Sequence, residues 1–364
     1  MQYNPNGEKS LVISKAYEYN KEGYLAKESI IQSGGEKKSK VIQYPNDYDR
    51  GTEFLDEMKD KNLLSYPVEV VEYIENESEA ISSAVISGNI NKYNIVGNGL
   101  LDESLMLEID TPLSLSNFKF SNQKLGVSPQ LGNNLIYQED PHYVSRIKFD
   151  LYDNYGNIIQ FSPNTSATTS LLWGYSGMYP IAEVIGSSST DMAYSSFEVV
   201  GEGGGWIYDH DFIVEDPSSP SGKKIFPLTP NLKLEKDKLN ANKSYVISYW
   251  RKSNEASPVK VSGEHKTVRG ETVNGWTYEE KLIRGKTDIV LSGEIPIDEV
   301  RLYPEGTSMT TRIYDPLIGM TFLNNGRGYG TIYNYDGLGR INGVRDEEGA
   351  LLESYKYMFS MEDQ

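Results

Sequence analysis

Apolar and polar residues alternate over short segments in much of this chain. Residues 244–250 have the sequence Ser-Tyr-Val-Ile-Ser-Tyr-Trp, and tyrosine occupies alternate positions at Tyr333 and Tyr335 and again at Tyr355 and Tyr357. Side chains two residues apart lie on one face of a strand, so each tyrosine pair places two rings together. The pattern predicts many short strands and an all-β fold.

Helical spacing is clear in one segment, from Thr52 to Lys61. Phe54, Leu55 and Met58 fall on one face of a helix there. Thr52 precedes them and is of a residue type that often occupies the N-cap position. We therefore expect one short helix in an otherwise β-rich chain.

Asp-x-x-Gly sequences separate the strands near the C-terminus. Asp336 is followed by Gly339, and Asp346 by Gly349. An Asp side chain can accept a hydrogen bond from the backbone two residues ahead, and Gly tolerates positive φ, so each sequence predicts a tight turn. Weaker copies of this strand–turn–strand pattern occur at residues 149–158 and, with Asn in place of Asp, at residues 17–25.

The charge of the chain limits its partners. It contains 52 Asp and Glu residues against 35 Lys and Arg, a formal net charge of −17. Proteins that bind nucleic acid or anionic membranes need a positive surface, so we expect neither partner. Cysteine is absent, which excludes disulfides and thiol chemistry. No apolar run is long enough to span a bilayer, so we expect no transmembrane segment.

Catalytic motifs are missing from the sequence. Its three histidines, His142, His210 and His265, form neither an H-E-x-x-H nor an H-x-H arrangement. Residues 174–177, Gly-Tyr-Ser-Gly, do not meet the G-x-S-x-G pattern of a nucleophile elbow. A pair of carboxylates that cleaves glycosidic bonds stays open as an alternative, because many acidic residues are present. We expect a protein that is not an enzyme.

Tryptophans cluster between residues 191 and 309. Trp206, Trp250 and Trp276 lie there, beside Gly-rich segments. Exposed indole rings could stack on the C–H faces of a sugar, and buried rings would instead form the core of a β-sandwich. We interpret Trp250 as core and name Trp206 and Trp276 as candidate glycan-binding residues, with the core interpretation open for both.

Two stretches resemble known families. Residues 335–340, Tyr-Asp-Gly-Leu-Gly-Arg, are similar to the Y-D-x-x-G-R core of YD-repeat (RHS-repeat) proteins. The tail from Tyr314 to Tyr357 resembles the C-terminal end of the large YD-repeat surface proteins of Bacteroidetes. Between residues 194 and 309, the order F-E, G-G-W, S-G-K, Y-x-x-S-Y-W, G-W and I-D-E-V resembles carbohydrate-binding-module-like jelly rolls.

These resemblances imply a YD-type scaffold of hairpins and sheets that flanks a jelly-roll β-sandwich. The expected regions are a β-rich YD-like scaffold at 1–190, a jelly-roll domain at 191–309 and C-terminal YD repeats at 310–364. In similar jelly rolls a structural calcium lies where the first and last strands meet. Glu198 and Asp298 stand at those places, so the resemblance implies a structural calcium there and no other cofactor. Two solvated acids are the alternative.

The resemblance also implies a function. It indicates a non-catalytic, structural and adhesive part of a larger secreted or cell-surface polypeptide, whose partner is a glycan or another cell-surface component. The first ten residues are polar and hold no signal peptide, so an extracellular location requires an export signal upstream of this segment. The alternatives are a shell fragment of a polymorphic toxin and a glycan-active enzyme.

Overall fold

The structure is a computed structural model that describes residues 13–31, 36–75, 83–94, 99–122, 136–199, 201–252, 259–326 and 330–358. Of these residues, 53% lie in strands and 6% in helices, which confirms the all-β prediction. The polar segments at residues 1–10 and 360–364 lie outside the described residues. No helix in the described part of the chain is long and apolar enough to cross a membrane.

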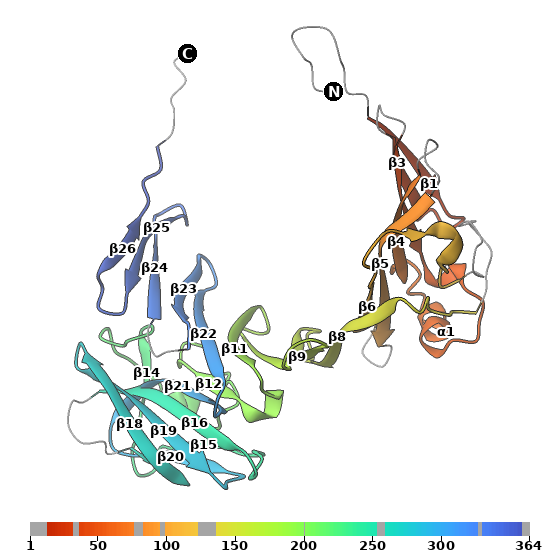
Figure 1. Ribbon diagram of the computed structural model, residues 1–364. Coiled ribbons are helices and arrows are strands. Elements are labelled where there is room, and N and C mark those ends of the chain that lie inside the picture. The colour runs from red at the N-terminus through yellow and green to blue at the C-terminus, as the bar shows by residue number, and fades with distance from the viewer. Residues whose placement is uncertain are drawn as a thin grey trace, which may run out of the picture. The chain divides into compact units, whose positions relative to one another are not determined.

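The chain forms two compact units. The N-terminal unit contains Met1–Asp150 and Ser162–Ser166, and the C-terminal unit contains Leu151–Phe161 and Ala167–Gln364. Figure 1 shows the strands of both units. The boundaries expected at residues 190 and 309 stay predictions.

The N-terminal unit is built on one antiparallel sheet. Its strands follow their order along the chain, and a short strand, β7 (Leu113–Ser114), pairs with β5. The order is β1 (Ser14–Tyr19), β2 (Leu25–Ile31), β3 (Lys37–Gln43), β4 (Glu69–Glu75), β5 (Ser83–Asn94), β6 (Leu100–Leu107) and β8 (Tyr143–Tyr152).

The predicted helix is present as α1 (Glu53–Asp60), the only α-helix in the part of the chain that the structure describes. Its apolar face buries Leu55 and Met58 against Val68. Thr52 occupies the N-cap position, but its side chain makes no capping hydrogen bond. Short 3-10 helices lie at Pro45–Asp47, Leu115–Asn117, Ser189–Asp191 and His210–Phe212.

Further antiparallel strands, here called the C-terminal sheet, lie mostly in the C-terminal unit. In it β11 pairs with β22, with Ala182 opposite Thr311, although a long stretch of sequence separates the two strands. The order is β9 (Ile158–Pro163), β10 (Thr169–Gly174), β11 (Tyr179–Ile185), β22 (Ser308–Asp315), β23 (Gly319–Asn324), β24 (Gly330–Tyr335), β25 (Ile341–Asp346) and β26 (Leu351–Ser354).

The chain between β11 and β22 forms a β-sandwich. The larger sheet has the order β13 (Val214–Glu215), β14 (Lys224–Pro227), β21 (Pro296–Pro304), β16 (Ser244–Arg251), β19 (Trp276–Arg284) and β18 (Glu264–Val273), with β12 (Ala193–Ser195) also on β21. The smaller sheet has the order β15 (Leu234–Lys236), β20 (Ile289–Ser292) and β17 (Lys260–Val261). The orders β14-β21-β16-β19 and β15-β20-β17 match those of a jelly roll, except that β18 pairs with β19 in the larger sheet. We refer to this sandwich as the jelly roll.

The middle strands of the larger sheet, β16 and β21, are buried on both faces. On the inner face, Ile247 and Leu302 pack with Leu234 and Leu291 of the smaller sheet. On the outer face, Tyr194 and Tyr303 pack with Ile181 and Val184 of β11 and with Met309 of β22, so the C-terminal sheet covers part of the jelly roll.

The Asp turns have Gly at positive φ, as predicted, and Asp336 makes the predicted bond two residues ahead, whereas Asp346 bonds four residues ahead. Asp336 Oδ1 accepts hydrogen bonds from the backbone N–H of Leu338 at 2.9 Å and of Arg340 at 3.0 Å, and Gly339 has a φ of +74°. Asp346 accepts from Ala350 at 2.7 Å, and the φ of Gly349 is +86°. The copies at Asn20 and Asp153 make equivalent bonds, with Gly23 and Gly156 at positive φ.

Candidate functional site

The structure buries the indoles that the sequence offers as a sugar platform. The exposed fraction is 3% for Trp206 and 0% for Trp276, and Trp250 is 4% exposed. All three rings are buried by their neighbours, so none has an open side for stacking. The expectation of an exposed ring at Trp206 or Trp276 is therefore corrected.

The two candidate indoles serve as core residues with satisfied polar atoms. Trp206 belongs to the cluster between the two sheets, and its Nε1–H donates to the carbonyl oxygen of Val300 at 3.1 Å. Trp276 packs with Trp250 and Tyr278, and its Nε1–H donates to Ser218 Oγ at 3.2 Å. Buried indoles usually find such a partner.

Glu198 and Asp298 both contact one loop, residues 219–224. Glu198 Oε1 accepts the backbone N–H of Lys224 at 2.7 Å and also that of Lys223. Asp298 Oδ2 accepts the hydroxyls of Ser219 and Ser221, each at 2.7 Å. The sequence thus identified two residues that fix the same loop.

Of this pair, Asp298 has surroundings that suit calcium and Glu198 does not. Asp298 Oδ2 meets two serine hydroxyl oxygens, which are hard donors of the kind that calcium prefers. Glu198 instead directs Oε1 at two backbone N–H groups, which a cation would have to displace. In the described part of the chain, no group of three or more His, Asp or Glu side chains could hold a metal ion.

Asp298 begins a row of buried charged groups on β21. Asp298, Glu299 and Arg301 are each 0% exposed. Burial, followed by the charge of Glu299, raises the pKa of Asp298 to about 8. Burial also raises the pKa of Glu299, which accepts hydrogen bonds from Tyr194 and, at 3.1 Å, from Thr311. This row ties the jelly roll to β22, on which Thr311 lies.

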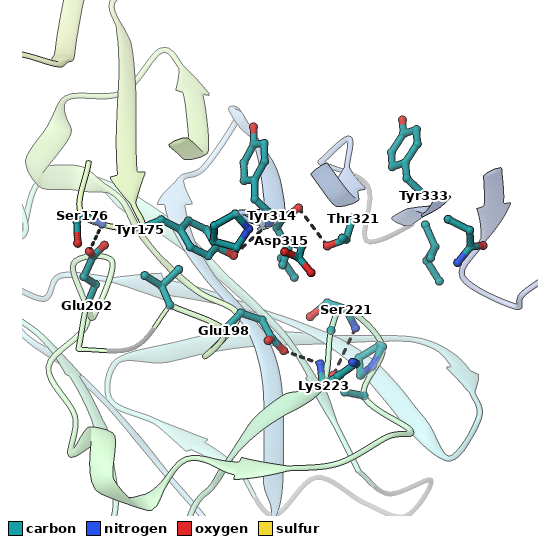
Figure 2. A pocket seen from close by; sticks show the side chains of 18 residues that line it. Tyr175, Ser176, Glu198, Glu202, Ser221, Lys223, Tyr314, Asp315, Thr321 and Tyr333 are labelled. Carbon is teal, nitrogen blue, oxygen red and sulfur yellow. Dashed lines mark hydrogen bonds between the residues drawn. The ribbon is translucent and has the colours of Figure 1, made fainter. Parts of the chain in front are cut away.

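A pocket of about 690 Å³ opens beside the 219–224 loop. We call it the loop pocket. Its lining comes from the β10–β11 turn at Tyr175 and Ser176, from Glu198, Val199, Glu202 and the segment 219–223 of the jelly roll, and from strands β22 to β24. Figure 2 shows the side chains that line it. All of these segments belong to the C-terminal unit.

Hydrogen bonds join the segments that form the loop pocket. Glu202 Oε1 accepts the backbone N–H of Ser176 at 2.6 Å, which ties the segment after β12 to the β10–β11 turn. The hydroxyl of Tyr175 accepts the backbone N–H of Tyr314 at 3.1 Å, which ties that turn to β22. Burial raises the pKa of the Tyr175 hydroxyl to about 12, so it is protonated at neutral pH.

The sequence did not reveal this pocket, because segments far apart along the chain form it. One lining residue, Glu198, is also a candidate calcium ligand from the sequence. No protein-family model matches the chain, and no curated protein matches it. The YD-repeat and carbohydrate-binding-module resemblances therefore rest on the residues alone and stay predictions.

Proposed function

We propose that this chain is a non-catalytic structural part of a larger secreted or cell-surface YD-repeat protein. On this proposal, its role is to hold a jelly roll firmly within a β-sheet scaffold and to present the loops around it to a partner. An extracellular location follows from this role.

One observation supports the proposal more than any other. The jelly roll is inserted between two paired strands, β11 and β22, and its larger sheet packs on the same strands through Tyr303 and Met309. A domain joined to a sheet by two strand connections and an apolar interface cannot move freely relative to that sheet, which suits a structural role. A domain on a flexible linker would lack both features.

An adhesive role requires a surface that can bind a partner. The buried indoles leave the jelly roll without the aromatic platform expected for a glycan. The loop pocket takes its place as the candidate binding site, because jelly-roll loops form one of its walls.

An experiment on Met309 tests the structural role. Met309 is 0% exposed in the cluster that joins the jelly roll to the C-terminal sheet. Met309→Ala should cost about 2–5 kcal/mol of stability, and pulse proteolysis should show cleavage of the jelly roll and of the sheet at the same denaturant concentration. Separate transitions would contradict the role.

A turnover assay tests the non-catalytic part. The protein should release no reducing sugar from neutral or acidic polysaccharides over long incubations. Reproducible release that disappears with Glu202→Gln, Asp315→Asn or Glu198→Gln would favour the glycan-active enzyme instead.

A further inference from the structure

We propose that the loop pocket binds a primary ammonium or guanidinium group. Such a group could come from a free polyamine or from a Lys or Arg side chain of a partner protein. The proposal rests on the proposed function, because it names the class of partner that a surface scaffold would hold there.

Acceptors outnumber charged donors in the loop pocket. The carboxylates of Glu198, Glu202 and Asp315 line it, and Lys223 is the only Lys or Arg among its described lining residues. Ammonium and guanidinium groups only donate hydrogen bonds, and ionised carboxylates only accept them. An anionic ligand would meet three like charges, so the charge of the wall selects a cation.

The carboxylates are held in place by backbone groups. Asp315 Oδ1 accepts the N–H of Leu317 at 3.0 Å, and Glu202 Oε1 accepts that of Ser176 at 2.6 Å. Each bond occupies one oxygen, and a carboxylate offers roughly four lone-pair sites. Fixed carboxylates with remaining acceptor capacity bind a donor at little cost in side-chain entropy.

Tyrosine rings supply a second feature that suits a cation. Tyr175, Tyr314 and Tyr333 line the pocket and are half-buried. Tyr179 stacks on Tyr314 at a centroid distance of 4.5 Å, and Tyr175 meets Tyr314 edge-on at 6.1 Å, which fixes the rings of Tyr175 and Tyr314. Aromatic faces attract ammonium and guanidinium groups, and the aliphatic stem of Lys or Arg can lie along a ring.

The size of the pocket agrees with such a ligand. Its volume of about 690 Å³ falls within the roughly 300–1,000 Å³ of small-molecule sites. A neutral sugar would also fit by volume, and Lys223, Thr321 and Asn334 could donate to its hydroxyls. Only a cation gains from the charge of the three carboxylates. Figure 2 shows Glu198 and Glu202 on the jelly-roll side of the pocket, and Tyr314, Asp315 and Tyr333 on the sheet side.

Titration of the full chain tests the proposal. The probes are spermine, N-acetyl-lysinamide and N-acetyl-argininamide, with cellohexaose as a neutral comparator, followed by NMR shifts or calorimetry at low salt. The cationic probes should bind, and added salt should weaken them. Binding of spermine alone would identify a polyamine source, and binding of the amino-acid amides would identify a side chain of a partner protein.

Matched variants separate the pocket from the general acidity of the chain. Asp315→Asn removes a charge but keeps an oxygen that can accept the Leu317 N–H, and it should weaken binding roughly 3-fold. Asp346→Asn makes the same change in a turn outside the pocket and should leave affinity unaltered. Lys223→Ala removes the competing cation and should tighten binding.

Three results would overturn the proposal. One is the absence of binding by any cationic probe when thermal unfolding shows a folded chain. Another is equal weakening by Asp315→Asn and Asp346→Asn, and the third is binding of cellohexaose in place of the cations. The structural function would survive all three, because proteolysis and turnover measurements test it separately.

Discussion

Glu198 and Asp298 hold one loop by different groups: Glu198 Oε1 accepts the N–H of Lys224, and Asp298 Oδ2 accepts the hydroxyl of Ser221, each at 2.7 Å. Gly222 lies between these contacts, and a Cβ there would come within 2.2 Å of Glu198 Oε1. The loop therefore depends on both carboxylates, as does the part of the loop pocket that it lines. Since Asp298 is fully buried, its ionisation should affect stability.

Asp298→Asn should change the pH dependence of unfolding. The pKa of Asp298 is raised to about 8 in the folded protein, by burial and then by the charge of Glu299, and is about 3.9 in an unfolded chain. Between these values the folded protein binds more protons than the unfolded chain, so the stability from this group falls as pH rises from about 4 to about 8. Asp298→Asn has no ionisable side chain at this position, so its stability should not fall for this reason.

Thermal unfolding in EDTA at pH 5 and pH 8 measures the effect. The Tm of Asp298→Asn minus the Tm of the wild-type protein should be higher at pH 8 than at pH 5 by roughly 3–6 °C. Asp346→Asn, at a half-buried turn position, should track the wild-type protein at both values. Equal changes in Tm at both pH values for Asp298→Asn would contradict the assignment.

Calcium at Asp298 would oppose this pH effect, because a divalent cation favours the ionised carboxylate. If calcium binds there, the Tm should be higher in millimolar calcium than in EDTA, since an ion that binds only the folded state stabilises it. Asp298→Asn should abolish the difference, and magnesium should be a poor substitute because it demands a stricter octahedral geometry. Identical melting in calcium and EDTA would remove calcium from the account of this loop.

Gly339→Val should destabilise the C-terminal sheet. Gly339 has a φ of +74°, and nothing lies within 4 Å of a Cβ placed there, so strain of the backbone alone opposes the change. The left-handed region costs an L-residue roughly 1–2 kcal/mol, and a β-branched residue resists it further. Gly337→Val is the control, because Gly337 has equal space and no positive φ. Similar Tm values for both variants would count against the turn.

Local physics explains which parts of the fold the sequence predicts. The turn at Asp336 needs only an acceptor, a Gly and a few intervening residues, so it is visible in the sequence. Helix α1 follows in the same way from the spacing of Leu55 and Met58. Strand β16 (Ser244–Arg251) forms where the strand-forming residues at 244–250 predict a strand.

Long-range packing explains what the sequence leaves undetermined. Whether Trp276 is exposed depends on the layers that cover its strand, and no local pattern reports a covering layer. The loop pocket likewise brings Glu202 to Ser176 and Tyr175 to Tyr314. Their spacing in the sequence carries no periodic signal.

Trp276→Ala should act on stability and not on glycan affinity. The ring is 0% exposed and packs against Trp250, Tyr278 and Ile225, so its removal leaves a cavity. Truncation of a buried Trp costs about 3–5 kcal/mol, which corresponds to a fall in Tm of roughly 10 °C for a unit of this size.

Trp276→Phe provides the matched variant, because it keeps an aromatic ring in the cluster and loses only the hydrogen bond to Ser218 and part of the volume. It should lie between the wild-type protein and Trp276→Ala in Tm. A glycan array measured on all three proteins at a temperature where each is folded should show no binding that depends on residue 276. An unaltered Tm in Trp276→Ala together with a lost glycan signal would mean that the ring is open to solvent and would restore the sugar platform.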